Sequence, residues 1–242
     1  FNAIPMNLKS AVSVGIGLFI AFVGLQNAHI VVGGSTLLQL FSVDAYNKAN
    51  GVEASFNNVG ITVILALAGI IITGILVVKN IKGNILWGIL ITWALGIICQ
   101  FAGLYVPNAD LGFYSLLPDF SKGLSIPSLA PIFGKLQFKG IFSVDFIVIL
   151  FAFLFVDLFD TIGTLVGVSA KADMLDEEGK LPHIKGALLA DAVATTFGAI
   201  LGTSTTTTFV ESASGVSEGG RTGLTAVTTA ILFGLSLFLS PI

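Results

Sequence analysis

Six long apolar stretches constrain the fold of this 242-residue chain more than any other feature of its sequence. A helix needs about 20 predominantly apolar residues to cross a bilayer. Stretches of about that length lie at 10–32, 59–78, 84–104, 144–169, 185–202 and 221–239. Only 10% of the residues are charged, whereas soluble domains carry about 25%. The sequence therefore predicts an all-α, polytopic (multi-pass) membrane protein.

The net charge excludes one class of partner. The formal charge is −3 and no basic cluster is present, so we expect no nucleic-acid partner. The single cysteine, Cys99, lies inside an apolar stretch and is expected to act as a small hydrophobic residue rather than as a redox or metal-binding group. Because the sequence begins at Phe1 without a methionine, we expect a piece of a longer membrane protein.

The connections between the stretches predict an orientation. Seven of the eleven Lys and Arg lie in the segments 79–83 and 170–184 or at Lys9, Lys185 and Arg221, and alternating spans place all seven on one side. The positive-inside rule makes that side cytoplasmic. The segment 105–143 holds four of the seven prolines and is predicted to be an extracytoplasmic Pro-rich loop, with a short interfacial helix as an option.

The hydroxyl-rich run TSTTTT at 203–208 is too polar and, with the residues up to 219, too short to cross as an ordinary helix. Irregular backbone at membrane depth is tolerated only where protein or a polar cavity surrounds it. We therefore predict a discontinuous span, with a short extended strand at 203–208 that reaches about the bilayer middle and a helix at about 209–219. Thr208 and Glu211 match a helix-capping box. Glu211 is then either a simple cap or part of a substrate site at a half-helix end.

A polar stripe marks the span 144–169. Asp157, Asp160, Thr161 and Thr164 share one helical face. Carboxylates inside a bilayer cost several kcal/mol and are functional candidates by default. We expect Asp160 to be functional, whereas Asp157 is either functional or a structural acceptor for neighbouring hydroxyls.

Three other groups of residues have structural interpretations. Gly163 and Gly167 form a small-xxx-small pair that favours close helix packing. Asp191 lies among small residues and is expected to anchor helix packing or a polar network rather than substrate. Gln26, Asn27 and His29 lie near the outer end of the first stretch. We expect them to be polar residues at the membrane interface rather than a hinge or gate contact.

The chain also resembles a known family. The stretches GIGLFIAFVGLQNA (15–28), FDTIGTLVGVS (159–169) and 175–227, which includes LGTSTTTTFVESASG, are similar to the AzgA-like guanine/hypoxanthine/adenine permease branch of the nucleobase:cation symporter 2 family. The resemblance implies a transporter of two inverted repeats of seven spans each, divided into core and gate domains. It implies that 1–104 holds gate-domain spans 5–7 and that 144–242 holds core-domain spans 8–11, on either side of the loop 105–143.

The resemblance also implies site residues. The span-8 carboxylate of the family falls on Asp160, the position one turn later falls on Thr164, and the span-10 carboxylate falls on Glu211, with the Val210 N–H beside it. Uracil permease carries a histidine at the Thr164 position, so proton handling by a histidine is not expected here. Together with Thr208, these residues are the expected substrate site, and Asp160, Glu211 and Asp157 are the candidates for proton coupling.

The expected chemistry is transport. A carboxylate that accepts two N–H bonds distinguishes a purine edge, and two acids that face one another in a low dielectric cannot both ionise cheaply, which links substrate binding to protonation. We expect a plasma-membrane permease that imports purines such as guanine, hypoxanthine or adenine by symport with a proton in preference to sodium, without a cofactor, metal or catalytic residue. The expected partners are the purine and the bilayer, with a homodimer as an open option.

Three alternatives were weighed. An intramembrane aspartyl protease needs a Gly-x-Gly-Asp segment, which the sequence lacks, so an enzyme is not expected. A passive channel needs a continuous polar pore, whereas the polar residues here are local. A related inverted-repeat carrier for another small anionic or heterocyclic solute stays open.

Overall fold

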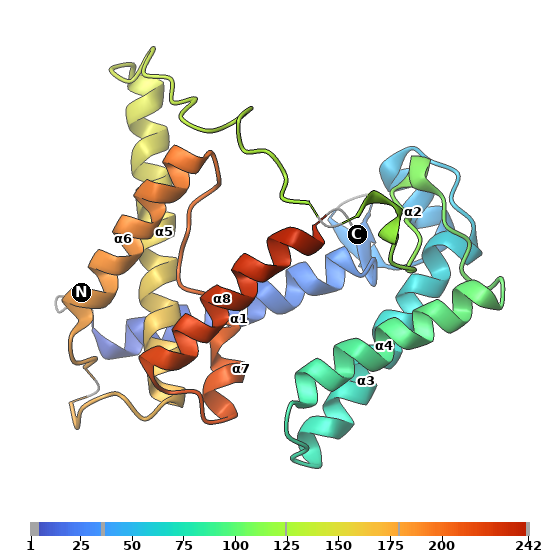
Figure 1. The fold of residues 1–242 in the computed structure, drawn as a ribbon, viewed down its shortest axis with the longest axis horizontal. Coiled ribbons are helices and arrows are strands. Elements are labelled where there is room, and N and C mark those ends of the chain that lie inside the picture. Colours follow the sequence, from blue (N-terminus) through green and yellow to red (C-terminus); the bar gives the residue numbers. More distant parts are fainter. Residues whose placement is uncertain (1–4, 35–36, 124, 179, 241–242) are drawn as a thin grey trace. The chain divides into compact units, whose positions relative to one another are not determined.

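The computed structural model describes residues 5–34, 37–123, 125–178 and 180–240 (Figure 1). The ends of the predicted segments 1–104 and 144–242 therefore lie outside the described residues. The chain forms two compact units. Unit 1 combines the chain up to Phe19 with the chain from Lys122 onward, and unit 2 is Ile20–Ser121. The assignment to gate and core domains stays a prediction, because these units are defined within this chain alone.

The predicted spans are observed as helices, with boundaries that move by a few residues. They are α1 (Met6–Asn27), α3 (Ile61–Val78, preceded by the π-helical turn η1, Phe56–Gly60), α4 (Asn84–Phe101), α5 (Val144–Lys171), α6 (Ile184–Leu201) and α8 (Gly223–Leu239). Among the described residues, five of these helices are long and apolar enough to cross a membrane, and α8 is a shorter apolar helix.

The helices end where the chain adopts a left-handed conformation. After α6, Gly202 has φ 83°, its N–H bonds to the Ala199 carbonyl and the Thr203 N–H bonds to the Gly198 carbonyl. His29 after α1 and Asp173 after α5 take the same place, with φ 58° and 55°. This pairing satisfies carbonyls that the last helical turn would leave unbonded. These three helices thus have defined ends, and α6 stops just before the threonine run.

Unit 1 contains α5, α6, α7 (Ser212–Ser217), α8 and the first part of α1. α5 begins at Ser143, whose hydroxyl accepts a bond from the Phe146 N–H. Its buried residues lie in its last half, from Thr161 to Ser169. α7 packs against α5. The C-terminal half of α5 is therefore the part that other segments of unit 1 surround.

Unit 2 contains the last part of α1, the helical hairpin α3–α4 and a small subdomain between α1 and α3 that was not predicted from the sequence. The strands β1 (Val31–Gly33) and β2 (Leu38–Leu40) pair antiparallel and precede the helix α2 (Val43–Asn50). A buried cluster joins them to α3 and to the loop after α4: Val32, Tyr46, Ala54, Val59, Ile61, Tyr105 and Phe113.

The loop 105–143 carries only short 3-10 turns in its described part, η2 (Ala109–Leu111) and η3 (Phe120–Lys122). The optional interfacial helix is thus replaced by two single turns. The loop approaches the end of α6, where the Gly134 N–H bonds to the Ile200 carbonyl over 2.8 Å. This bond satisfies one carbonyl in the last turn of α6.

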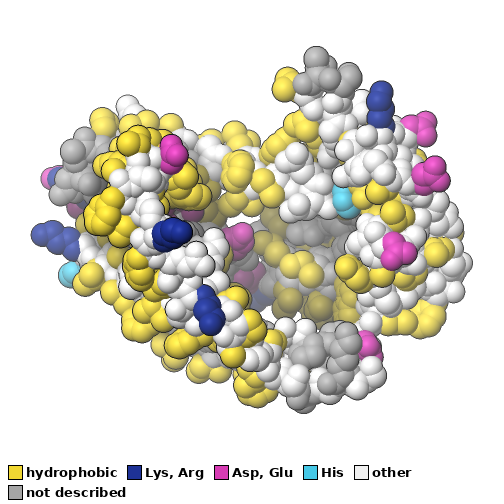
Figure 2. All heavy atoms as spheres, turned by 90° about the horizontal axis from the view of Figure 1, so that it is seen from above, with side chains coloured by type: hydrophobic (Ala, Val, Ile, Leu, Met, Phe, Trp, Pro, Cys, Tyr) yellow, Lys and Arg dark blue, Asp and Glu magenta, His cyan; other side chains and the backbone are white. Residues whose placement is uncertain are grey.

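Much of the surface of both units is apolar. Hydrophobic side chains cover a large part of the face shown in Figure 2. Phe142 is 91% exposed and Phe19 is 66% exposed. A soluble protein rarely exposes large contiguous apolar area, so this surface is suited to lipid or to further transmembrane helices.

Candidate functional site

The threonine run leaves α6 at Gly202 and continues without helical structure as far as Phe209. An unbroken helix through this region is therefore excluded, and the predicted interruption of the helix is observed. Threonine is β-branched and favours extended backbone. Among the described residues the run pairs with no second strand, and Figure 1 shows the chain between α6 and α7 as a stretched-out coil.

Hydroxyl groups satisfy polar groups along this segment. The Thr195 hydroxyl on α6 donates to the Thr206 carbonyl over 2.7 Å, and the Thr203 hydroxyl donates to the Ser204 carbonyl over 2.9 Å. Gly198 on α6 is buried beneath the segment, and a Cβ there would lie 2.6 Å from the Thr206 hydroxyl and 2.8 Å from the Thr203 hydroxyl. Glycine is thus the residue that allows this close approach.

Asp191 connects the segment to α5. One of its carboxylate oxygens accepts a bond from the Thr161 hydroxyl over 3.2 Å, and the other accepts a bond from the Thr208 hydroxyl over 3.4 Å. The Thr161 hydroxyl is also 3.0 Å from the Thr207 hydroxyl. Three segments, α5, α6 and the threonine run, therefore share one polar network.

The short helix after the run begins later than predicted. α7 spans Ser212–Ser217, and Glu211 is its N-cap, with helical φ and ψ of −58° and −20° and no side-chain capping bond to a described residue. The capping-box interpretation is therefore wrong. The Thr208 hydroxyl bonds to Asp191 instead of to the helix N-terminus. Val210 lies in the preceding turn, where its carbonyl accepts a bond from the Ala213 N–H.

Four carboxylates gather around this network. Asp160 on α5 lies close enough to both Asp191 and Glu211 for their charges to act on one another, and Asp157 stands in the same relation to Asp160 and Asp191. Oδ1 of Asp157 is buried without a hydrogen-bond partner among the described residues. The structure thus brings together the acids of α5, α6 and the broken crossing.

Thr164 lies one turn beyond Asp160 and is 2% exposed. Its hydroxyl bonds to no other described residue. Gly163 and Gly167 face the first part of α1, because a Cβ at Gly163 would lie 2.9 Å from Cγ1 of Val12 and a Cβ at Gly167 would lie 3.7 Å from Cβ of Ser13. These glycines therefore serve close packing between α5 and α1.

His29 lies in unit 2 rather than among these acids. Its ring meets the rings of Tyr46 and Phe113 edge-on, with centroids 5.1 and 5.8 Å apart. Burial lowers the pKa of its imidazole below the ordinary value. His29 thus belongs to the buried cluster of the unit 2 subdomain.

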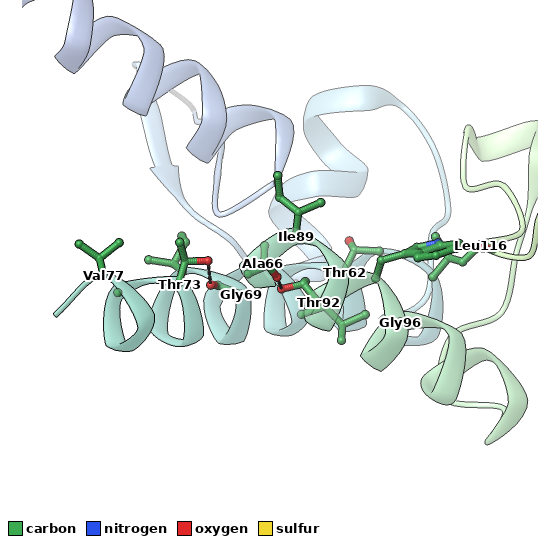
Figure 3. Close-up of a pocket in the computed structure, with 14 residues that line it drawn as sticks. Thr62, Ala66, Gly69, Thr73, Val77, Ile89, Thr92, Gly96 and Leu116 are labelled. Atoms are coloured by element: carbon green, nitrogen blue, oxygen red, sulfur yellow. Dashed lines mark hydrogen bonds between the residues drawn. The ribbon is translucent and has the colours of Figure 1, made fainter. Parts of the chain in front are cut away.

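Unit 2 also carries a groove of about 790 Å³ along α3 and α4, which is lined mainly by apolar side chains and by glycines (Figure 3). Its threonine hydroxyls are bonded within their own helices, Thr73 to the Gly69 carbonyl and Thr92 to the Gly88 carbonyl. The groove therefore offers shape and apolar surface but few unpaired polar groups.

Thr195 and Thr207 are members of the network that were not predicted from the sequence. The signal for Thr195 was present, because Asp191, Thr195 and Gly198 follow one another at i, i+4 and i+7 on one helical face. Thr207 carried no separate signal, since every residue of the run from Thr205 to Thr208 is a threonine.

Several helices of membrane-spanning length, with half-buried carboxylates on α5 and α6 beside a non-helical segment, define this molecule as a multi-pass membrane protein. The family model described as "Permease family" (Xan_ur_permease) matches residues 1–242. The chain therefore belongs to this permease family, the nucleobase:cation symporter family that the sequence resembles, and not to a family of enzymes.

Individual relatives carry purine names. The guanine/hypoxanthine permeases PbuG and PbuO of Bacillus subtilis are 42% and 41% identical over 100% of this chain and 49% and 50% of their own lengths. The adenine permease AdeP of Escherichia coli is 35% identical over 99% of this chain and 47% of its own length. The chain thus spans about half the length of these curated relatives.

Proposed function

We propose that the permease containing this chain is a secondary transporter that imports purine nucleobases such as guanine, hypoxanthine or adenine across the plasma membrane. One observation carries the proposal. The broken crossing brings Glu211 within electrostatic range of Asp160 on α5, in a chain whose named relatives are guanine/hypoxanthine and adenine permeases. Such a pair of acids is suited to a ligand that presents several N–H donors.

In this proposal the substrate lies against the residues Asp160, Thr164, Thr208, Val210 and Glu211. The unpartnered hydroxyl of Thr164 supports this role, because a buried hydroxyl without a partner costs free energy until a ligand supplies one. The purine would bond to one carboxylate through its N–H groups while the second carboxylate exchanges the coupled proton. Asp160, Glu211 and Asp157 are the proposed coupling groups, with a proton preferred over sodium.

The proposed architecture is a pair of seven-span inverted repeats. Residues 1–104 would supply gate spans 5–7, residues 105–143 the extracytoplasmic loop, and residues 144–242 core spans 8–11. The end of α7 facing the acids supports this, because carriers of inverted-repeat design build their sites at broken helices near the bilayer centre. Alternating access would then arise from movement of the core against the gate, and a homodimer remains an unassigned option.

Uptake of radiolabelled purine by cells that express the full-length permease tests the proposal. We expect Glu211→Gln and Asp160→Asn each to reduce uptake to the level of cells without the permease, because each removes an ionisable acceptor. Asp145→Asn, in the exposed first turn of α5, and Glu177→Gln, in the exposed loop after it, are the matched controls. Uptake near the wild-type level in either site variant would exclude the proposed roles.

A proton uncoupler and a sodium-free medium separate the two coupling ions. We expect the uncoupler to abolish accumulation against a gradient and the removal of sodium to leave it unchanged. The second candidate is a carrier for another small anionic or heterocyclic solute. The acids of the site disfavour an anionic solute. Competition of purine uptake by excess unlabelled pyrimidines or carboxylates would identify it.

A further inference from the structure

One face of α6 contacts the threonine run along its length. Gly198 lies under Thr203 and Thr206, the Thr195 hydroxyl donates to the Thr206 carbonyl, and Asp191 accepts a bond from Thr208. As the residue numbers rise along the run, the contacted positions on α6 fall from Gly198 to Asp191. The run therefore returns antiparallel to α6 along the C-terminal part of that helix.

The spacing of these contacts matches the geometry of the two backbones. From Thr206 to Thr208, two extended residues cover roughly 6.6 Å. From Thr195 to Asp191, four helical residues cover about 6 Å. The two contacts can therefore form together only in one register, since a slip by one residue would shift the run by roughly 3.3 Å.

The alternation of side chains fixes the same register. Thr206 and Thr208 contact α6, whereas Thr207 between them contacts Thr161 on α5. Successive side chains of an extended segment point to opposite sides, so a slip by one residue would exchange the two faces. Thr161 also bonds to Asp191, which connects the α5 contact to the α6 contacts.

We propose that Asp191, Thr195 and Gly198 form a register face on α6 that fixes where the broken crossing stops, and thereby holds Glu211 opposite Asp160. These three are positioning residues, because they act through the threonine run rather than through the substrate. Glu211 follows Thr208 by three residues and immediately precedes α7, so any slip of the run moves Glu211 along α5. The effect on transport rests on the proposed function, whereas the register itself does not.

The variant Thr195→Val tests the register face, since it keeps the shape of the side chain and removes the donor to the Thr206 carbonyl. Thr195→Ser keeps the donor and serves as the conservative rescue. Thr196→Val is the matched control, because the Thr196 hydroxyl bonds to the Ala192 carbonyl of its own helix over 2.8 Å. Gly198→Ala adds a second disruption by a different route, through a Cβ that crowds Thr206.

The first readout is a disulfide formed between cysteines at 161 and 207, in a full-length protein from which every native cysteine, Cys99 included, has been removed. The Thr161 and Thr207 hydroxyls are 3.0 Å apart, so we expect this pair to be oxidised more efficiently than the pairs 161–206 and 161–208. Thr195→Val and Gly198→Ala should lower the yield of the 161–207 pair relative to its neighbours. An unchanged ranking of the three pairs in both variants would overturn the proposal, whether or not the protein transports purines.

The second readout is the concentration dependence of purine uptake, normalised to the permease present in the membrane. We expect Thr195→Val to raise KM by roughly three- to ten-fold with Vmax per permease little changed, the size of effect that one hydrogen bond produces. Thr195→Ser and Thr196→Val should match wild type. A Thr195→Val variant that only loses protein from the membrane, with KM unchanged, would show a merely structural role and would also overturn the proposal.

Discussion

At the scale of single residues, His29 has two roles. It takes the left-handed conformation that follows α1, and its ring packs against the buried cluster of unit 2. Its φ of 58° ends α1, and its ring packs on Tyr46 and Phe113. Positive φ is uncommon outside glycine, asparagine, aspartate and histidine. Burial lowers the pKa of the His29 imidazole, so it favours the neutral ring beside the cluster.

We predict that the unit 2 subdomain becomes less stable in acid through His29. Burial lowers the pKa of His29 in the folded protein below 6.5, so its contribution to stability is fully present above pH 6.5 and is lost as the pH falls toward the folded pKa. Hydrogen exchange of residues 37–58 in the full-length permease should therefore accelerate between pH 7.5 and pH 5.5, after correction for the intrinsic pH dependence of exchange.

His29→Phe keeps an aromatic ring and removes the titration, so its corrected exchange should not change over that range. His183→Asn is the control, because His183 is exposed, occupies a similar left-handed position before α6 with φ 59°, and lies in unit 1. Equal acid sensitivity in wild type and His29→Phe would assign the effect to another group.

Single residues also show the limit of prediction from sequence. Asp157 and Asp160 were singled out because an acid in an apolar stretch stands out by its cost, and Glu211 because it stands at the predicted half-helix end; Asp160 lies within electrostatic range of Glu211. The role of Thr208 was assigned to a capping box by its spacing alone, and the structure shows a bond to Asp191 instead. Local spacing could not reveal this, because the competing acceptor lies on α6.

At the scale of elements, α3 and α4 pack through reciprocal glycine–threonine contacts, which Figure 3 shows from the groove that they line. Gly69 on α3 faces Thr92 on α4, and Gly88 on α4 faces Thr73 on α3. Each glycine removes a side chain where the facing threonine needs the space. Small residues allow close backbone approach in membrane helices, where dispersion contacts drive the association.

We predict that Gly69→Ala and Gly88→Ala each destabilise the permease by about 1–3 kcal/mol, the usual cost of overpacking. A Cβ at Gly69 would lie 2.6 Å from the Thr92 hydroxyl, whereas a Cβ at Gly74 has no described atom within 4 Å. Gly74→Ala, the same substitution on the same helix, should be neutral or stabilising by up to about 1 kcal/mol. Thermal unfolding of the full-length protein in detergent measures the difference.

The pair Gly69→Ala and Thr92→Ala provides a further check. If the cost comes from the contact with Thr92, then Gly69→Ala should cost less in a Thr92→Ala background than in wild type, as a double-mutant cycle would show. Equal costs in the two backgrounds, or equal Tm values for Gly69→Ala and Gly74→Ala, would contradict this account of the hairpin.

The elements themselves were predictable to different degrees. Hydropathy located the six apolar helices because lipid requires every backbone group to be bonded within the segment. The hairpin β1–β2 and the helix α2 were missed. Their stability depends on the cluster that joins Val32 and Tyr46 to Tyr105 and Phe113, and contacts so distant in sequence leave no local pattern.

At the scale of the whole molecule, two contacts within unit 1 indicate how the chain threads the membrane. At one end of α6, the Gly134 N–H bonds to the Ile200 carbonyl. At the other end of the bundle, Arg221 donates to Asp173 over 3.0 Å, which joins the loop after α5 to the residues before α8. Residue 221, which follows the interrupted segment, therefore lies on the same side of unit 1 as the C-terminal end of α5.

This arrangement agrees with the predicted distribution of positive charges. The loop 170–184, Lys185 and Arg221 would share one side, and the loop 105–143 would lie on the other. In this predicted topology the polar segment 203–219 is the crossing that returns the chain after α6, not an extramembrane loop. If it were a loop on the surface, Arg221 would lie on the side opposite to Asp173, and their hydrogen bond could not form.

We predict that cysteines at positions 82, 180 and 222 label from the same side of the membrane, and that a cysteine at 135 labels from the opposite side. The full-length protein with every native cysteine replaced, Cys99 included, provides the background, and a membrane-impermeant maleimide applied to intact cells and to inverted vesicles provides the readout. The positive-inside rule places positions 82, 180 and 222 in the cytoplasm, so they should react only in inverted vesicles. Labelling of position 222 from outside, with 180 labelled from inside, would show that the segment 203–219 does not return the chain and would remove Glu211 from the depth of Asp160.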